Sequence, residues 1–135
     1  IKDTFRVESK RYLTYYDEKW ECKLFLNFKT VEENNENNLI ENLSSSLSIN
    51  RSSIHCEIKG NQVDEKYSVS HKEMRTYNHR LYEVSISNFP EIMRNDNFTL
   101  NGKHYYWMSI DDMRKDKEII KKNLEIVEFV HSHIN

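Results

Sequence analysis

The chain contains very little glycine and proline: two Gly and one Pro among 135 residues. Phosphate-binding loops of the types G-x-x-x-x-G-K-S/T and G-x-G-x-x-G need several glycines close together, because the backbone must approach the phosphate with no side chain in the way. Neither pattern occurs here. The commonest glycine-based nucleotide sites are therefore excluded.

Long apolar runs are lacking too. No stretch approaches the roughly 20 apolar residues that a membrane-spanning helix needs, and the mean hydropathy is -0.86. Residues 1–6 mix apolar and charged types, which is unlike a secretory signal. The length predicts a single domain, residues 1–135. Because the chain begins with Ile rather than Met, we expect it to be part of a longer protein.

Cysteine is scarce, with Cys22 and Cys56 alone. Each lies in an alternating stretch typical of a strand, so two reduced core thiols are predicted. A disulfide remains the alternative, because the spacing does not forbid one. The histidines and cysteines do not show the paired spacing of a zinc site. Neither a metal nor a cofactor is predicted.

Charge of neither sign dominates. Twenty Lys and Arg stand against 22 Asp and Glu, which gives a net charge of -2, and the two signs are interleaved. Duplex nucleic acid is bound through an extended basic surface, so it is not an expected partner. A compact ligand with one to three phosphates needs only a local basic pocket.

Apolar periodicity predicts an α+β domain. Leu39, Leu43 and Leu47 recur at i, i+4 and i+8, which predicts a helix near residues 38–48. A short helix is expected from Asp111, capped by Ser109, and a closing helix at 123–133. Residues 100–103 predict a hairpin turn. Strands are expected at 11–16, 20–28, 54–60, 66–70, 79–87 and 104–108.

Two passages resemble Nudix domains. Residues 105–113, an aromatic strand with Trp107 followed by a Ser-led turn, and then residues 123–127, are similar to the end of many such domains. The core of the Nudix box, R-E-U-x-E-E-x-G-U with U aliphatic, falls on residues 41–49, where Leu43 and Ile49 match the aliphatic positions. The resemblance implies a Nudix-like mixed sheet sandwiched by helices.

The functional positions of the box depart from the family. Family glutamates hold divalent cations, which require anionic oxygen ligands. The aligned residues are Asn42, Ser45 and Ser46, and Glu41 stands where the family has arginine. The resemblance thus implies no catalytic residues, no metal site and loss of pyrophosphohydrolase activity. A domain that binds a nucleotide without cleaving it is the expectation.

A polar-aromatic cluster between residues 68 and 82 is the candidate ligand site. Arginine offers phosphate a bidentate fork and tyrosine offers a base a face for stacking. Arg11 and Tyr15, beside Tyr12 and Tyr16, form a second candidate surface. The alternatives are a solvated charged hairpin and aromatics that fill the core or cover a sheet edge. In the main cluster, phosphate clamping is assigned to Arg75, Arg80 and Lys72, stacking to Tyr77 or Tyr82, and hydrogen bonding to His71, His79 or Asn78.

Among Nudix-like proteins, the chain resembles the SMODS-associated Nudix domains of transmembrane effectors in bacterial antiphage (CBASS) signalling. The low glycine content and the loss of the family glutamates from the Nudix box agree with this group. The resemblance implies a sensor of a cyclic di- or trinucleotide that forms a homo-oligomer on activation. It also implies a cytoplasmic domain, tethered to the bacterial inner membrane through segments outside this chain.

Two other classes of function remain open. One is a Nudix-like nucleoside-diphosphate hydrolase that uses carboxylates outside the box, such as Glu32, Glu33 or Glu36. The other is a protein interaction module that binds no small ligand.

Overall fold

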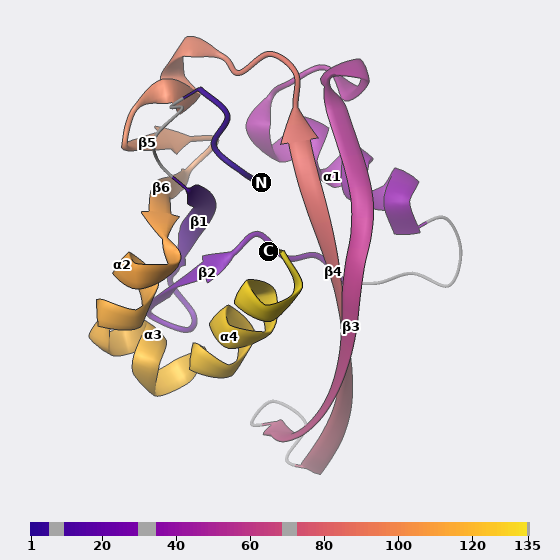
Figure 1. Cartoon of the computed structure of the whole chain (residues 1–135), viewed down its shortest axis with the longest axis vertical. Helices are drawn as coiled ribbons and strands as arrows, with labels where there is room; N and C mark the ends of the chain where they lie inside the picture. Colours follow the sequence, from indigo (N-terminus) through magenta and orange to yellow (C-terminus); the bar gives the residue numbers. More distant parts are fainter. Residues whose placement is uncertain (6–9, 30–34, 69–72, 135) are drawn as a thin grey trace.

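The computed structural model describes residues 1–5, 10–29, 35–68 and 73–134, of which 64–68, 73 and 75–78 are described by their backbone alone. The chain forms strands, α-helices and two short 3-10 helices (Figure 1), so the predicted α+β class is confirmed. The elements are β1 (Arg11–Asp17), β2 (Cys22–Phe25), α1 (Asn35–Leu47), η1 (Arg51–Ser53), β3 (Ile54–Ser68), β4 (Glu73–Ile86), η2 (Glu91–Arg94), β5 (Asn97–Leu100), β6 (Lys103–Ser109), α2 (Ile110–Lys115), α3 (Lys117–Lys122) and α4 (Leu124–His133).

A four-stranded sheet has the order β2-β1-β6-β5. Every strand pairing among the described residues is antiparallel, so the expected mixed sheet is wrong. Tight turns join β1 to β2 and β5 to β6, and strands joined in this way must run antiparallel. The second turn is the predicted hairpin, in which Asn101 and Gly102 take φ values of 51° and 81°. Asn-Gly tolerates such angles, which suit two-residue hairpins.

The sheet separates two apolar cores. Leu13 pairs with Trp107 across β1 and β6, and Tyr12 pairs with Met108. Because successive side chains point to opposite faces, the first pair belongs to a core shared with α1 and the base of the β3-β4 hairpin. The second pair belongs to a core shared with α2, α3 and α4. Helical elements thus lie on both sides of the sheet (Figure 1).

Three predicted helices are confirmed, with adjusted limits. Helix α1 begins three residues before the expected residue 38 and buries Leu43 and Leu47. Ser109 caps α2 through a capping box with Asp112, as its sequence position indicates. The closing helix begins at residue 124 and follows a separate short helix, α3. No described helix has the length and apolar character that crossing a membrane would require.

Strand predictions were less accurate. Only residues 22–25 of the expected strand 20–28 form a strand, which is β2. Trp20 lies in the preceding turn with 53% of its surface exposed. The three strands expected between residues 54 and 87 are one long hairpin, β3 with β4. Gly60 does not end a strand, because the pairing continues past it through a register shift between Ile58 and Gly60. A β-bulge of this kind lets a strand continue with a local bend.

Both cysteines are free thiols, as predicted. Cys22 is buried in the core under α2–α4, whereas Cys56 packs at the edge of the other core. The four-stranded sheet therefore lies between the two cores that hold them. Burial raises the pKa of both thiols above the usual value, and this keeps them protonated at neutral pH.

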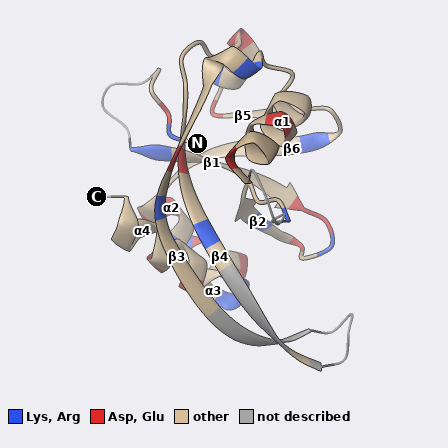
Figure 2. Ribbon diagram, turned by 90° about the vertical axis from the view of Figure 1, so that its right-hand side faces the viewer, with Lys and Arg blue, Asp and Glu red and all other residues tan. Residues whose placement is uncertain are grey.

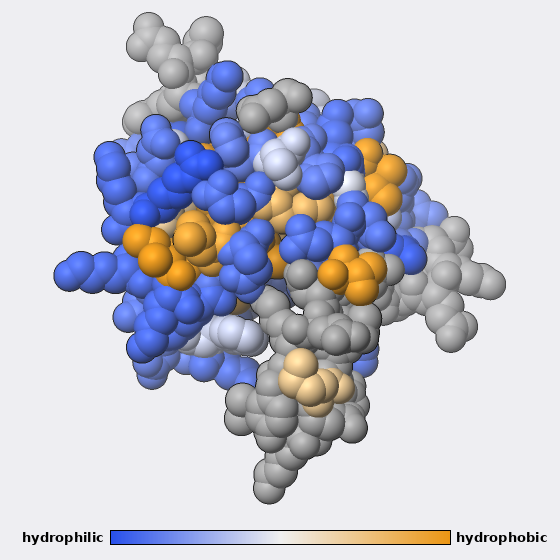
Figure 3. All heavy atoms as spheres, turned by 60° about the horizontal axis from the view of Figure 1, so that its bottom comes forward, coloured by the Kyte–Doolittle hydropathy of each residue, from blue (hydrophilic) through white to orange (hydrophobic). Residues whose placement is uncertain are grey.

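The described surface carries no broad face of one charge. Figure 2 shows positive and negative residues scattered over the same elements. On the face in Figure 3, hydrophilic residues predominate and surround small hydrophobic patches. An anionic ligand would therefore meet a local group of cations rather than an extended basic surface.

Candidate functional site

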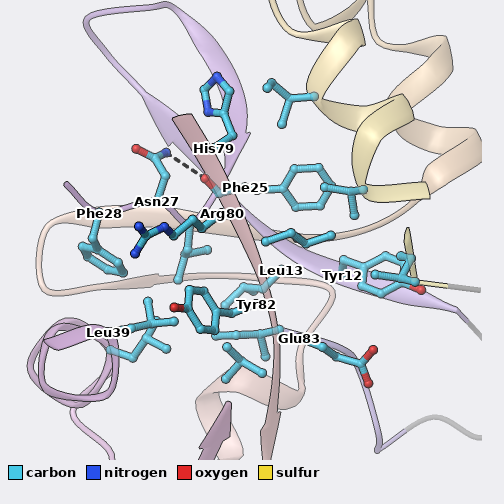
Figure 4. Close-up of a pocket in the computed structure, with 18 of the residues that line it drawn as sticks. Tyr12, Leu13, Phe25, Asn27, Phe28, Leu39, His79, Arg80, Tyr82 and Glu83 are labelled. Carbon is cyan, nitrogen blue, oxygen red and sulfur yellow. Dashed lines mark hydrogen bonds between the residues drawn. The ribbon is translucent and has the colours of Figure 1, made fainter. Parts of the chain in front are cut away.

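A cavity of about 240 Å³ lies where five parts of the fold meet. They are the N-terminal residues 1–2, the β1-β2 region with the segment after β2, the first half of α1, residues 79–84 of β4, and the C-terminal residues 126–134 (Figure 4). Its volume is somewhat below the roughly 300–1,000 Å³ typical of small-molecule sites. The lining residues are Ile1, Lys2, Tyr12, Leu13, Phe25, Leu26, Asn27, Phe28, Lys29, Asn35, Asn38, Leu39, Leu43, His79, Arg80, Leu81, Tyr82, Glu83, Val84, Ile126, Phe129, Val130 and Ile134.

Most of the cavity wall is apolar. Leu13, Leu43 and Val84 are buried parts of the core that underlies it. Phe28 and Tyr82 are only partly buried against that core, so their rings remain accessible. Apolar walls with a few polar groups are the usual composition of a ligand site, because burial of ligand surface supplies affinity and polar groups fix orientation.

The cations of the cavity include two exposed side chains, Arg80 and Lys29. In Figure 4, Arg80 extends toward the side that carries Asn27 and Phe28, the residues just before Lys29. Arg80 and Tyr82 lie on the same face of β4, since they are two residues apart. A guanidinium group is thus presented next to an accessible aromatic ring.

Glu83, Tyr12 and Lys2 also line the cavity. Residue 83 is three positions from Arg80 on β4, so its side chain points to the opposite face of the strand, and Figure 4 shows Glu83 beside Tyr12 and away from Arg80. Burial raises the pKa of the Tyr12 hydroxyl, and the Glu83 carboxylate raises it further. Tyr12 therefore stays neutral at physiological pH and can both donate and accept hydrogen bonds. The Glu83 carboxylate and the Arg80 guanidinium group are thus on opposite faces of β4.

Asn27 at the cavity is oriented by a hydrogen-bond chain. Its Nδ2 donates to the Phe25 carbonyl at 2.9 Å and to Tyr15 Oη at 3.2 Å. Tyr15 Oη in turn donates to Asp17 Oδ2 at 3.0 Å. Because the backbone carbonyl can only accept, these bonds fix which end of the amide is the donor. Tyr15 itself lines only a small recess of about 10 Å³ beside the cavity.

The structure brings together part of the predicted ligand site. His79, Arg80 and Tyr82 all line the cavity. The predicted residues His71 and Lys72 lie outside the described residues. The side chains of three others, Arg75, Tyr77 and Asn78, lie outside them as well. Ligand contacts by these five residues therefore remain predictions.

Arg11 lies elsewhere, away from the cavity lining. Its side chain, 11% exposed, donates from Nε to Asp3 Oδ2 and from Nη1 to Asp96 Oδ1, each at 2.9 Å, while Nη2 lies 2.9 Å from Asp3 Oδ2 as part of the ion pair. Burial lowers the pKa of Arg11, but the hydrogen bonds to Asp96 and Asp3 outweigh this and raise it overall. Arg11 thus holds the N-terminal segment and the loop before β5 against β1.

Several cavity residues were missed from the sequence. Asn27 and Phe28 belong to the end of the expected strand 20–28, Lys29 follows it directly, and Glu83 belongs to the polar face of another expected strand. The alternation of residues 20–28 hid the first group, because it continues past the end of β2. The run of asparagines at the start of α1 is a signal that could have indicated Asn35 and Asn38, since polar side chains gather there without a packing pattern.

The helix that resembles the Nudix box carries no carboxylate at the positions of the family glutamates. Asn42 and Ser46 are partly exposed and Ser45 is exposed. The last turn of the helix is instead bound by Asn101, whose Nδ2 donates to the Ser46 carbonyl at 3.0 Å and to Ser48 Oγ at 3.0 Å. Across the described part of the chain, His, Cys, Asp and Glu form no group of three or more that could hold a metal ion.

Comparisons of the chain with protein-family models, with curated proteins and with solved structures find no match. The likeness to Nudix domains therefore remains a prediction from residues 41–49 and 105–127.

Proposed function

We propose that this domain binds a nucleotide in the cavity between α1, β4 and α4 and does not cleave it. The observation that carries the proposal is the pairing of accessible aromatic rings, Phe28 and Tyr82, with the exposed cations Arg80 and Lys29 around one apolar space. A nucleotide has the same two parts, a flat base and an anionic phosphate. Stacking of a base on an aromatic side chain contributes roughly 1–3 kcal/mol, whichever base is bound.

Arg80 is the residue best suited to hold the phosphate. Its planar guanidinium group can donate two parallel hydrogen bonds to phosphate oxygens, and such charge-assisted bonds are stronger than neutral ones. Lys29 adds a point charge at the same cavity. Tyr82, on the face of β4 that carries Arg80, would place a stacked base within reach of that phosphate.

The absence of cleavage is argued from the donor types on α1. Hard divalent cations bind anionic oxygen ligands, and Asn42, Ser45 and Ser46 offer neutral groups. Glu36 is exposed and is the acidic residue in the first turn of α1, whereas Glu32 and Glu33 lie outside the described residues. A single carboxylate cannot assemble the several-metal centre that the Nudix reaction uses.

We further propose that the ligand is a cyclic di- or trinucleotide and that the domain is the sensor of a CBASS membrane effector. The cavity can enclose one base and its sugar, while the remaining nucleotides would lie along the exposed cations. Binding would favour association of several copies, by the difference in ligand affinity between the separate and associated states. The resemblance of the sequence supports this finer assignment, and the membrane part would belong to segments outside this chain.

Thermal unfolding with a panel of cyclic dinucleotides, cyclic trinucleotides and linear nucleotides tests the proposal. A ligand at 100 times its Kd stabilises the folded state by roughly 2.7 kcal/mol. The variant Arg80→Ala should weaken binding about tenfold or more, since a hydrogen bond to a charged group contributes roughly 1.5–3 kcal/mol. Arg51→Ala is the matched control, because Arg51 pairs with Glu41 on the surface and does not line the cavity.

Three results would favour other functions. Turnover of a nucleoside diphosphate derivative with Mg²⁺ or Mn²⁺, lost in Glu36→Ala, would favour the hydrolase. If no nucleotide raises the unfolding temperature, the proposal is refuted and the interaction module is favoured. The aliphatic part of the wall, which includes Leu39, Leu81 and Ile126, favours a second candidate ligand, an anion with an apolar chain. Stabilisation by a fatty acid but by no nucleotide would select it.

A further inference from the structure

A small recess adjoins the cavity and shares one wall with it. Leu26, Asn27 and Phe28 line both spaces. Arg80 lines the cavity but not the recess, and in Figure 4 it extends toward the side of this shared wall. Lys103 lines the recess but not the cavity. The shared wall therefore has one of these two cations on each side.

Both cations belong to the same side of the four-stranded sheet. Tyr15 pairs with Tyr105 across β1 and β6, and Lys103 is two residues from Tyr105, so these side chains point to one face of that sheet. Both tyrosines belong to the core that this face shares with α1. Tyr82 packs against the same core, and Arg80, two residues away, is on the same face of β4. One ligand can therefore contact both cations.

The ammonium group of Lys103 is held above an aromatic ring. Its Nζ lies 4.9 Å from the centroid of the Tyr15 ring, a distance at which cation–π attraction operates. The ring is held in turn, because Tyr15 Oη accepts from Asn27 and donates to Asp17. The other oxygen of the Asp17 carboxylate accepts from the Trp20 N–H. Lys103 is exposed, so its N–H groups can reach a ligand at the mouth of the recess.

The size of the recess limits what it can hold. Its volume of about 10 Å³ is roughly the space of a single water-sized oxygen atom. A base or a sugar is too large for it. A phosphate group can place one oxygen in the recess and present its other oxygens to the Lys103 ammonium group at the rim. The recess therefore suits an anionic group and not a second base.

We infer that Lys103 and the recess form a second phosphate subsite, which is occupied by a ligand whose two phosphates are separated by a nucleoside. This inference rests on the proposed function, because Arg80 must hold the first phosphate. Phosphates joined directly, as in a nucleoside diphosphate, are one bridging oxygen apart and cannot reach across the wall that carries Phe28. In a nucleoside 3′,5′-bisphosphate or a cyclic dinucleotide, a sugar or base can lie over Phe28 between the two phosphates.

Titration calorimetry with four adenine nucleotides, repeated with their guanine counterparts, tests the subsite at low ionic strength, where charge screening is least. The probes are AMP, ADP, adenosine 3′,5′-bisphosphate and cyclic di-AMP. ADP and the 3′,5′-bisphosphate carry the same number of phosphates, but only the second has the sugar between them. The bisphosphate and cyclic di-AMP should bind roughly fivefold more tightly than AMP, because each gains one ion pair with an exposed lysine.

Two lysines provide matched variants. Lys103→Gln should weaken the 3′,5′-bisphosphate and cyclic di-AMP about fivefold, because that ion pair is lost, and should leave AMP and ADP unchanged. Lys23→Gln is the control: Lys23 Nζ lies 4.3 Å from the centroid of the Tyr106 ring, and this lysine lines neither space. Tyr106 follows Tyr105 in β6, so Lys23 is on the opposite face of the sheet. This control should bind every ligand unchanged.

Two further variants separate the subsites from each other and from folding. Arg80→Ala should weaken all four ligands, because each has a phosphate for the first subsite. Lys103→Arg, which keeps the charge, should keep the preference for separated phosphates. Thermal unfolding of each variant without ligand shows whether it is folded.

The possible failures are distinct. Equal binding of AMP and the 3′,5′-bisphosphate, or a preference that Lys103→Gln retains, overturns the second subsite and leaves nucleotide binding in place. A loss that extends to AMP, or that Lys23→Gln reproduces, also overturns it, because net charge would then be the cause. If ADP depends on Lys103 as strongly as the bisphosphate does, the separation of the phosphates by a nucleoside is wrong. Failure of every nucleotide to bind overturns the proposed function together with this inference.

Discussion

Gly60 of β3 and His133 of α4 are in such close contact that no side chain fits between them. A Cβ atom on Gly60 would lie 2.5 Å from Cδ2 and 2.9 Å from Cγ of the His133 ring. That ring is held in place by Nδ1 contacts of 2.8 Å with the Phe129 carbonyl and 2.9 Å with Ser132 Oγ. The contact joins the end of α4 to the long hairpin beside the cavity.

Substitution Gly60→Ala should destabilise the domain by about 1–3 kcal/mol, because an added methyl group forces a held ring or the backbone to move. Chemical denaturation measures this loss. The double variant Gly60→Ala with His133→Ala should be less destabilised than the sum of the single changes. Gly102→Ala is the control: nothing lies within 4 Å of its Cβ, and its cost of roughly 1–2 kcal/mol comes from a positive φ. Adding His133→Ala should not reduce the loss of stability caused by Gly102→Ala.

This contact also explains why the sequence predicted the hairpin incorrectly. Locally, Gly60-Asn61 is typical of a strand end, and the alternation of Ile54 and Cys56 supports a short strand. The glycine is required instead by His133 of α4, which is distant in the sequence, and β3 continues past Gly60. No local pattern contains that information. By contrast, the turn at Asn101-Gly102 and the cap at Ser109 depend on neighbouring residues alone, and both were predicted correctly.

The candidate site was predictable only where one segment supplies it. His79, Arg80 and Tyr82 belong to one strand, so their density in the sequence indicated them. Phe28 and Glu83 acquire their positions from the packing of separate elements around the cavity, and neither belongs to a motif. Arg11 illustrates the converse: an arginine beside aromatics in the sequence is bound in the fold by Asp3, which is 2% exposed.

The ion pair between Arg11 and Asp3 should be important for stability. Removal of one partner of a buried pair leaves an uncompensated charge and costs roughly 3–5 kcal/mol. Arg11→Ala should therefore lower the free energy of unfolding by a few kcal/mol, as measured by denaturant titration. Nucleotide affinity, measured where the variant is folded, should not change. Arg114→Ala is the control, because its pairing with Glu128 is exposed and surface pairs contribute about 0–1 kcal/mol.

Asn101 should stabilise the end of α1 through its side-chain amide. The variant Asn101→Asp keeps the size and the tolerance of positive φ but replaces the donor with an acceptor, which would face the Ser46 carbonyl. We expect a loss of about 1 kcal/mol or more in the free energy of unfolding. Hydrogen exchange should increase in the last turn of α1. Asn101→Gly removes the bonds while it keeps the turn, so a neutral effect of both variants would show that the amide contributes nothing.

The Tyr15 hydroxyl should lose its proton at a higher pH than the hydroxyl of an ordinary tyrosine. Burial is the main cause that raises its pKa to about 12; the bond from Asn27 lowers it, and the bond to Asp17 raises it. The folded pKa thus exceeds the unfolded value of about 10. A group with this sign contributes stability in full below pH 10 and loses it as the pH rises from about 10 to about 12. In Tyr15→Phe, unfolding free energy should therefore be lower at neutral pH and should fall less steeply over that range. NMR titration of labelled tyrosine Cζ atoms identifies Tyr15 as the signal that this variant lacks. A midpoint near 10 for that signal would mean that the Tyr15 hydroxyl is not buried in solution as it is in this structure.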